Sequence, residues 1–247
     1  MAISPATSFT IVAPSGGGFV HGITWNGNLY NIRVTGVSVS KVLGDGIVIG
    51  QNNVTVIESC GAYTTASTGF QADTVANCVA HLCGNTGVLA TTAENCYGDS
   101  TGSADGVSAT TANNCYGSSI SGSGLNAQTA NNCYGFSTSA TAPGLNAQLA
   151  TGCIGTNSNG GDGLVAVMAN NCYGYSTDGG NGVVATTANN CYGVTDYGYG
   201  VWTTIAIGCY GVTLSNLGLV SFIANSSYGS LTNFAAVEVV THPYNMP

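Results

Sequence analysis

A six-residue phrase, Ala-Asn-Asn-Cys-Tyr-Gly, recurs along the chain and constrains its fold more than any other feature. It occurs intact at residues 112–117, 130–135, 169–174 and 188–193, and in altered form at 93–98, 150–155, 206–211 and 224–229. From Cys60 to Ser227, successive copies of the Cys position lie 18 to 20 residues apart. A period this short indicates one small structural unit stacked many times, which is the pattern of a solenoid.

Each repeat has one part of constant length and one of variable length. From Gly69 onward, the Cys position lies nine residues after a glycine, as in Gly69/Cys78 and Gly182/Cys191. All length variation falls between the Cys position and the next glycine, where Ser, Thr, Gly and Asp dominate. The constant part is too short for a helix, and its alternation of side chains predicts strands with small apolar residues pointing inward. The variable part predicts a turn.

These patterns predict an all-β chain that folds as a single-stranded right-handed parallel β-helix, or β-solenoid. We expect about 10–11 rungs of 18–20 residues each. Residues 1–30 are expected to form an N-terminal cap or lead-in, residues 31–230 the β-helix, and residues 231–247 a C-terminal cap or tail. Caps are expected because an open coil would expose unpaired strand edges.

The recurring phrase itself predicts a corner. The second Asn suits the turn, because Asn tolerates a left-handed backbone and its amide can hydrogen-bond to the copy in the next rung. Past the corner, the Cys should point inward, the Tyr outward and the Gly inward, into a section too narrow for a side chain. The predicted asparagine ladder is Asn95, Asn114, Asn132, Asn171 and Asn190.

Nine of the ten cysteines occupy the same position of successive repeats, and Cys83 is the exception. We therefore expect an interior cysteine ladder of mostly free thiols that act as small buried apolar groups, rather than a set of disulfides. The chain has no Cys-x-x-Cys pair, so no metal site is expected. The predicted ladder is Cys60, Cys78, Cys96, Cys115, Cys133, Cys153, Cys172, Cys191 and Cys209.

The segments at residues 44–49 and 54–60, together with the Asn-Cys columns, resemble the right-handed parallel β-helix repeats of the pectate-lyase-like superfamily. The chain also resembles repetitive bacterial surface proteins built from Asn-Cys-x-Gly rungs. The resemblance covers about residues 20–230 and implies the fold. Lyases of this superfamily use a basic residue with acidic calcium ligands, and its hydrolases use clustered aspartates. No two acids here share an outward position in adjacent rungs, so these roles are not carried over.

Composition excludes several classes of partner. Only 5% of residues are charged, the formal net charge is −8, and Arg33 and Lys41 are the only Lys or Arg residues. The chain is therefore not expected to bind nucleic acid or an anionic membrane surface. It has no run of about 18 apolar residues, so membrane insertion is not expected. Residues 1–15 lack the pattern of a signal peptide.

The remaining polar residues do not form an evident site. The histidines are scattered, and Arg33 and Lys41 lie near Asp45, which suggests a surface ion pair. Acids in the variable turns are expected to be solvated, with a weak calcium site as the alternative. No other cofactor is expected. These turn acids are Asp99, Asp162, Asp178 and Asp196.

Two outward columns remain as candidates for function. A tyrosine ladder either only stacks within the chain or also contacts another protomer, a surface or a glycan. A second column has Thr92, Thr111 and Thr187 but is broken by apolar residues, which weakens an ice-binding interpretation. Trp202 and neighbouring valines suggest an association face toward the C-terminal end. The predicted tyrosine ladder is Tyr97, Tyr116, Tyr134, Tyr173, Tyr192, Tyr210 and Tyr228.

We therefore expect a non-catalytic structural or adhesive solenoid of a cell surface, an extracellular fibre or a virion. It should self-associate through its end coils or the tyrosine ladder. One alternative is a β-helix that binds or cleaves polysaccharide, as a tailspike or lyase does, and another is an ice-binding solenoid. An enzyme is not expected, because the repeats carry almost no charged side chains.

Overall fold

The structure, a computed structural model, describes residues 2–3, 9–12, 18–25, 30–51 and 54–231. Within these residues every regular element is a β-strand, and none is a helix that could span a membrane. The chain divides into two compact units, residues 1–127 and 128–247. Apart from residue 231, the predicted C-terminal cap lies outside the described residues, as do parts of the predicted lead-in over residues 1–30.

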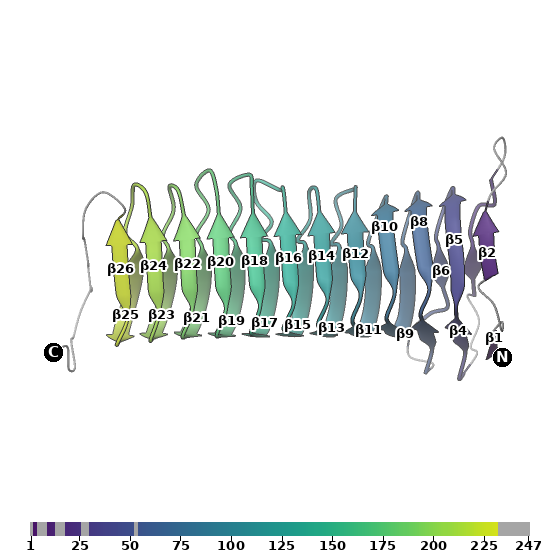
Figure 1. Ribbon diagram of the computed structural model, residues 1–247, viewed down its shortest axis with the longest axis horizontal. Helices are drawn as coiled ribbons and strands as arrows, with labels where there is room; N and C mark the ends of the chain where they lie inside the picture. The colour runs from purple at the N-terminus through teal and green to yellow at the C-terminus, as the bar shows by residue number, and fades with distance from the viewer. Residues whose placement is uncertain (1, 4–8, 13–17, 26–29, 52–53, 232–247) are drawn as a thin grey trace. The chain divides into compact units, whose positions relative to one another are not determined.

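In the N-terminal unit, strands pair in parallel to form two sheets, here called sheet A and sheet B (Figure 1). Strands within residues 1–30 already pair with later ones, β1 with β4, β2 with β5 and β3 with β6. Sheet A contains β1 (Ala2–Ile3), β3 (Ile23–Thr24), β4 (Arg33–Thr35), β6 (Ile47–Val48), β7 (Val56–Glu58), β9 (Phe70–Ala76), β11 (Val88–Glu94) and β13 (Val107–Asn113). Sheet B contains β2 (Phe9–Val12), β5 (Val37–Val42), β8 (Gly61–Thr65), β10 (Val79–Cys83), β12 (Tyr97–Ser100) and β14 (Tyr116–Ser119).

The C-terminal unit has the same two-sheet arrangement, and β15 (Leu125–Asn131) contains the point where the units divide. Sheet A contains β17 (Leu145–Thr151), β19 (Leu164–Asn170), β21 (Val183–Asn189), β23 (Val201–Ile207) and β25 (Leu219–Asn225). Sheet B contains β16 (Tyr134–Ser137), β18 (Ile154–Asn157), β20 (Tyr173–Ser176), β22 (Tyr192–Thr195), β24 (Tyr210–Thr213) and β26 (Tyr228–Leu231). The prediction of an all-β solenoid of parallel strands is confirmed.

Neighbouring coils pair in register, so that each side chain lies next to its counterpart in the next repeat. In β17 and β19, Leu145 pairs with Leu164 and Ala150 with Ala169. These leucines and alanines are completely buried, and Ala147 and Ala166 between them are also buried, while the other residues of these segments are half-buried or exposed. The core is therefore a set of columns of small apolar side chains, as the alternation in the sequence predicts.

The corner between the two sheets has a left-handed backbone. Asn190 has a φ of 49°, and φ lies between 51° and 53° at the other four predicted corner asparagines. Asn95 Nδ2 donates to Asn77 Oδ1 of the preceding rung at 3.2 Å. Gly152 and Gly208 replace Asn at this position with φ of 63° and 62°. The conformation, rather than the amide alone, is therefore what each rung requires.

Replacing Asn190 by alanine should destabilise the C-terminal unit by about 1 kcal/mol, because alanine disfavours the left-handed conformation by about 1–2 kcal/mol. Asn190→Gly is the matched control and should lose less, since Gly208 occupies the equivalent position of the next rung. Guanidinium unfolding followed by far-UV circular dichroism measures both. Equal midpoints for the alanine variant and the natural protein would contradict this account.

The interior narrows at two facing columns of glycine. A Cβ added at Gly193 would overlap the carbonyl oxygen of Gly200, and one added at Gly174 would overlap that of Gly182. Neither glycine has a positive φ, so the requirement here is space rather than backbone freedom. The structure thus confirms that the glycine after the Tyr points into a section where no side chain fits.

A column of buried polar side chains, four residues after the Cys position, fixes the variable turns. Ser176 Oγ donates to Gly161 O at 2.6 Å, and Ser119 Oγ donates to Ala104 O at 2.7 Å. Asn157 Nδ2 donates to Ala142 O at 2.8 Å. Cys83 pairs with Thr65 and Ser100 in the same column. The one cysteine outside the predicted ladder therefore occupies a position that other rungs give to a hydroxyl or an amide.

Candidate interaction surfaces

All ten cysteines are buried, and none forms a disulfide. Typical members of the interior ladder donate a hydrogen bond to the carbonyl oxygen two residues earlier, as Cys172 Sγ does to Asn170 O at 3.2 Å. The pKa of the Cys153 thiol is raised to about 11, mainly through its hydrogen bond with the Cys133 thiol. At Cys209, a hydrogen bond with Cys191 instead lowers the pKa to about 7. Burial keeps these sulfur atoms away from external reactants.

The tyrosine ladder is stacked along the direction in which the coils succeed one another. In the C-terminal unit the ring centroids of Tyr192 and Tyr210 are 5.3 Å apart with an interplanar angle of 5°, and those of Tyr210 and Tyr228 are 5.4 Å apart at 18°. In the N-terminal unit, Tyr97 and Tyr116 are 5.1 Å apart at 10°. In these three stacked pairs each ring covers a face of its neighbour. The Tyr173–Tyr192 pair is tilted instead, at 51°, and Ile154 takes the place of Tyr in the coil before Tyr173.

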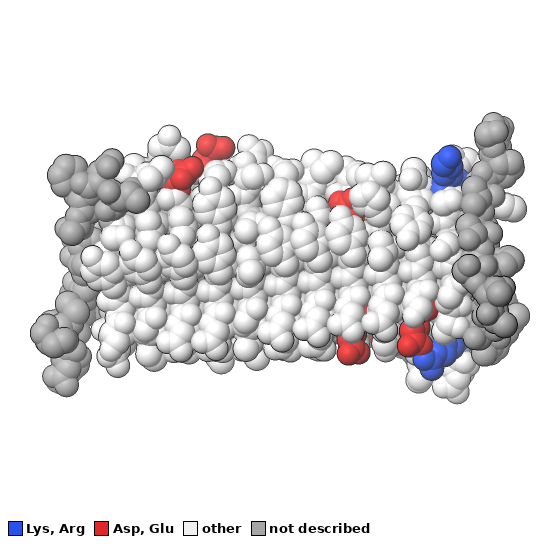
Figure 2. Space-filling view, viewed as in Figure 1, with Lys and Arg blue, Asp and Glu red and all other residues white. Residues whose placement is uncertain are grey.

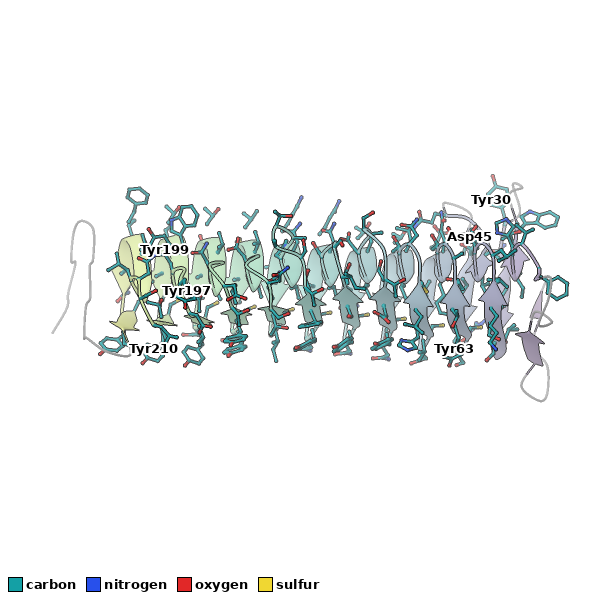
Figure 3. All side chains as sticks on the ribbon, turned by 90° about the horizontal axis from the view of Figure 1, so that it is seen from above. Tyr30, Asp45, Tyr63, Tyr197, Tyr199 and Tyr210 are labelled. Carbon is teal, nitrogen blue, oxygen red and sulfur yellow. The ribbon has the colours of Figure 1, made fainter. Side chains whose placement is uncertain are left out.

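Phenol hydroxyls tie parts of the ladder to the next rung. Tyr134 OH lies 2.9 Å from Thr156 Oγ1, and Tyr210 OH lies 3.0 Å from Ser230 Oγ. Figure 3 shows Tyr210 projecting outward from sheet B. A ladder of this geometry stabilises the stack, but it offers few free ring faces on which a sugar or another flat ligand would stack.

Several charged residues of the N-terminal unit form ion pairs between coils. Arg33 pairs with Glu58, whereas the sequence suggested a pair near Asp45. Asp45 Oδ2 instead lies 3.2 Å from His21 Nδ1, and Asp45 Oδ1 accepts from Thr68 N at 3.1 Å. The partners come from different coils, which is why sequence proximity did not identify them.

Two other carboxylates also bind the following coil. Asp162 Oδ1 accepts from Asn181 N at 2.7 Å, and Asp105 Oδ1 accepts from Ser123 N at 2.9 Å. Burial raises the pKa of Asp105. Asp162 is therefore a structural turn residue rather than only a solvated one. In the described part of the chain, no three His, Cys, Asp or Glu side chains are grouped so that they could hold a metal ion.

No family model matches the chain, and neither the curated proteins nor the solved structures contain a match to it. Its function therefore has to be argued from the surfaces of the two units. The interior columns account for the Cys, Gly and corner Asn residues, and the turn contacts account for several of the acids.

The outer face of sheet A in the C-terminal unit carries large apolar side chains. Phe222 is 66% exposed, Ile223 55%, Val167 53%, Trp202 49% and Met168 46%. We call these five residues the apolar stripe. The equivalent outward positions of β9, β11 and β13 in the N-terminal unit include Asp73 and threonines. Trp202 is the one residue that the stripe shares with the association face suggested by the sequence; Val165, Val184 and Val220 of that face are half-buried.

A shallow hollow of about 300 Å³ lies within this face. Small side chains, including Ala166, Ala185 and Thr186, line it together with Trp202 and Phe222. The sequence indicated the outward apolar residues through their column positions. It gave no signal for the hollow, which depends on how the outward side chains of neighbouring strands lie against each other.

Proposed function

We propose that this protein is a non-catalytic structural or adhesive β-solenoid that self-associates, at a cell surface, in an extracellular fibre or on a virion. The observation that carries the proposal is the chemistry of its outer faces. Among the described residues of the C-terminal unit, the only charged side chains are Asp162, Asp178 and Asp196, all outside the strands. On the face seen in Figure 2, charged atoms over β16–β26 lie only along the turn edge. Uncharged sheet faces favour contact with another surface.

The carboxylates support a structural rather than a catalytic role. Asp105 and Asp162 each accept a backbone N–H from the next coil, a contact that joins successive coils. A glycosidase needs two carboxyl groups flanking one bond, about 5–10 Å apart. Such a pair is not formed by Asp45, Asp105 and Asp162. They belong to coils far apart in the sequence, and each accepts a hydrogen bond from a backbone N–H of its own neighbouring coil.

The alternatives have less support. A polysaccharide-cleaving member of the pectate-lyase-like superfamily would need a groove with paired acids, whereas Asp105 and Asp162 each bind a backbone N–H of the next coil. Ice binding would need a regular row of threonines. In β19, β21 and β23 that row reads Met168, Thr187 and Ile205.

Negative-stain microscopy and light scattering of the purified protein test the proposal. We expect particles larger than one chain whose population grows with protein concentration. A glycan array and an assay for uronate release, run in parallel, should give no signal. A monodisperse monomer at high concentration, or turnover of a polysaccharide that is lost on replacing Asp105 or Asp162, would overturn it.

A further inference from the structure

We propose that the outer face of sheet A in the C-terminal unit binds the same face of a second copy of this chain. This inference rests on the proposed self-associating function, and it assigns the contact to the apolar stripe rather than to the tyrosine ladder or the end coils. The occupant is a second copy because the face has both a protruding part and a complementary hollow.

The protruding part lies on β25 and β23. Phe222 is the most exposed of the five stripe residues, and Ile223 follows it on the same strand. Trp202 on β23 pairs with Val220 of β25, and its ring lies 6.1 Å from that of Tyr199 at an interplanar angle of 55°. Figure 3 shows Tyr199 near the turn edge of this unit. Contact with Tyr199 restricts the orientation of Trp202, so less side-chain entropy is lost on binding.

The receiving part lies on β19 and β21. Ala166 and Ala185 pair across these strands and form part of the hollow, and Thr186 lines it beside them. The volume of about 300 Å³ is enough for one aromatic side chain. Thr203 is buried, and its hydroxyl donates to Thr186 O at 3.1 Å, so this part of the wall is already hydrogen-bonded.

Protrusion and hollow are arranged so that a two-fold axis relates them. Thr186, Thr204 and Phe222 occupy the same position of the successive strands β21, β23 and β25. A two-fold axis parallel to the strands and close to β23 places Phe222 of one copy over Ala185 and Thr186 of the other, and the reverse contact forms at the same time. Such a self-complementary contact closes as a dimer.

The spacing and charge of the face also fit a second copy. Both copies carry strands at the same interval of about 4.8 Å, so an axis close to β23 aligns β25 of one copy with β21 of the other. The stripe has no charged residue that would select an acidic or basic partner. The acids Asp162, Asp178 and Asp196 lie outside the strands, where like charges do not face each other across the contact.

The size of the face sets the expected strength. Four strands about 4.8 Å apart, each of seven residues rising about 3.3 Å, cover roughly 450 Å² per copy. The total of about 900 Å² is below the 1,200–2,000 Å² of stable specific interfaces, so a weak, reversible dimer is expected.

Sedimentation velocity of the full chain between about 1 and 200 μM tests this. The natural protein should shift from monomer to dimer, and Phe222→Asp should raise the dissociation constant at least tenfold, because it buries a charge in the contact. Leu214→Asp is the matched control: Leu214 is 47% exposed in a turn outside the stripe, and the same added charge there should leave the equilibrium unchanged. Circular dichroism verifies that each variant is folded.

Disulfide trapping tests the geometry without adding a charge. In the double variant Thr186→Cys with Phe222→Cys, the two positions are two strands apart, or about 10 Å, which is too far for a disulfide within one chain. Oxidation should therefore give covalent dimers, which run at twice the monomer mass without reductant. The natural cysteines are buried and should not cross-link.

Each outcome separates this inference from the proposed function. Assembly that survives Phe222→Asp but is lost in Tyr210→Asp overturns the sheet A contact and leaves a self-associating solenoid. Trapping that yields only monomer also overturns the contact. A natural protein that stays monomeric to 200 μM overturns both. Dimers that dissociate in Phe222→Asp alone, together with covalent trapping, support the inference.

Discussion

Gly193→Ala should destabilise the C-terminal unit by about 3 kcal/mol, because it adds a methyl group where the interior is narrowest. The added Cβ would overlap the carbonyl oxygen of Gly200 and would also contact Val201 Cγ2 at 2.9 Å. The first of these atoms is backbone in the next coil, so relief requires the sheets to move apart. Overpacking of this kind typically costs about 1–3 kcal/mol or more, with little room for repacking in a rigid stack.

The control for Gly193→Ala is Gly179→Ala. Gly179 has a φ of 114°, and a Cβ there would meet nothing within 4 Å, so this substitution isolates the cost of backbone conformation, about 1 kcal/mol. Guanidinium unfolding monitored by circular dichroism compares the two. If the Gly193 variant is as stable as the Gly179 variant, the two sheets can move apart at the glycine columns at little cost in free energy, which contradicts this account.

Stability should also fall as the pH rises from 9 to 11, in part through Cys83. Burial, and then the nearby Asp99 carboxylate, raise the pKa of this thiol from 9.0 to about 11, against a lowering by the Thr65 hydroxyl. In the unfolded chain the thiol ionises from about pH 9, whereas the fold retains its proton to about pH 11. The contribution of the protonated Cys83 thiol to the free energy of unfolding is therefore complete below pH 9. It is lost between pH 9 and 11, by up to about 3 kcal/mol.

The variant Cys83→Ser isolates this contribution, because serine does not titrate in this range and the neighbouring Ser100 shows that the column accepts a hydroxyl. The free energy of unfolding is measured at pH 8, 9, 10 and 11 for both proteins. The difference between them should change by roughly 2–3 kcal/mol across the range, with the natural protein losing more. Parallel curves would show that the Cys83 thiolate is not penalised by burial.

The repeat made much of the fold predictable. A strict interval between Gly182 and Cys191, repeated in other coils, fixes which positions of each strand face inward. In β21 these are Val183, Ala185 and Ala188. The corner at Asn190 followed from the backbone preference of asparagine, and φ there is 49°. These are local properties of one coil, which every repeat presents again.

Contacts that depend on the length of the turns could not be predicted. Ser176 reaches Gly161 O and Asp162 reaches Asn181 N only once the variable loops have brought them together. The pairing of Arg33 with Glu58 likewise joins coils whose separation in the sequence differs from the later repeat. Turn conformation is set by these few contacts and not by the periodic pattern, so the pattern carries no information about it.

The candidate surface was only partly predictable for the same reason. The outward position of Tyr210 followed from alternation, but the choice between rings that stack and rings that splay depends on side-chain torsions. The stacked rings stabilise the contact between neighbouring coils, and their stacked faces are not available to a ligand. Trp202 and its neighbours were visible as outward apolar residues, whereas the hollow beside Ala185 arises from differences in side-chain size across three strands.

The confinement of length variation to the turns between sheet B and sheet A separates two kinds of genetic change. One residue inserted into β21 would move every later inward residue of that strand to the outside and place a bulky group in the glycine section. One residue inserted between Thr195 and Tyr199 would only enlarge a loop at the edge. The gene can therefore tolerate insertions and deletions in its loops and the gain or loss of whole coils, but not the insertion or deletion of single codons within the strands.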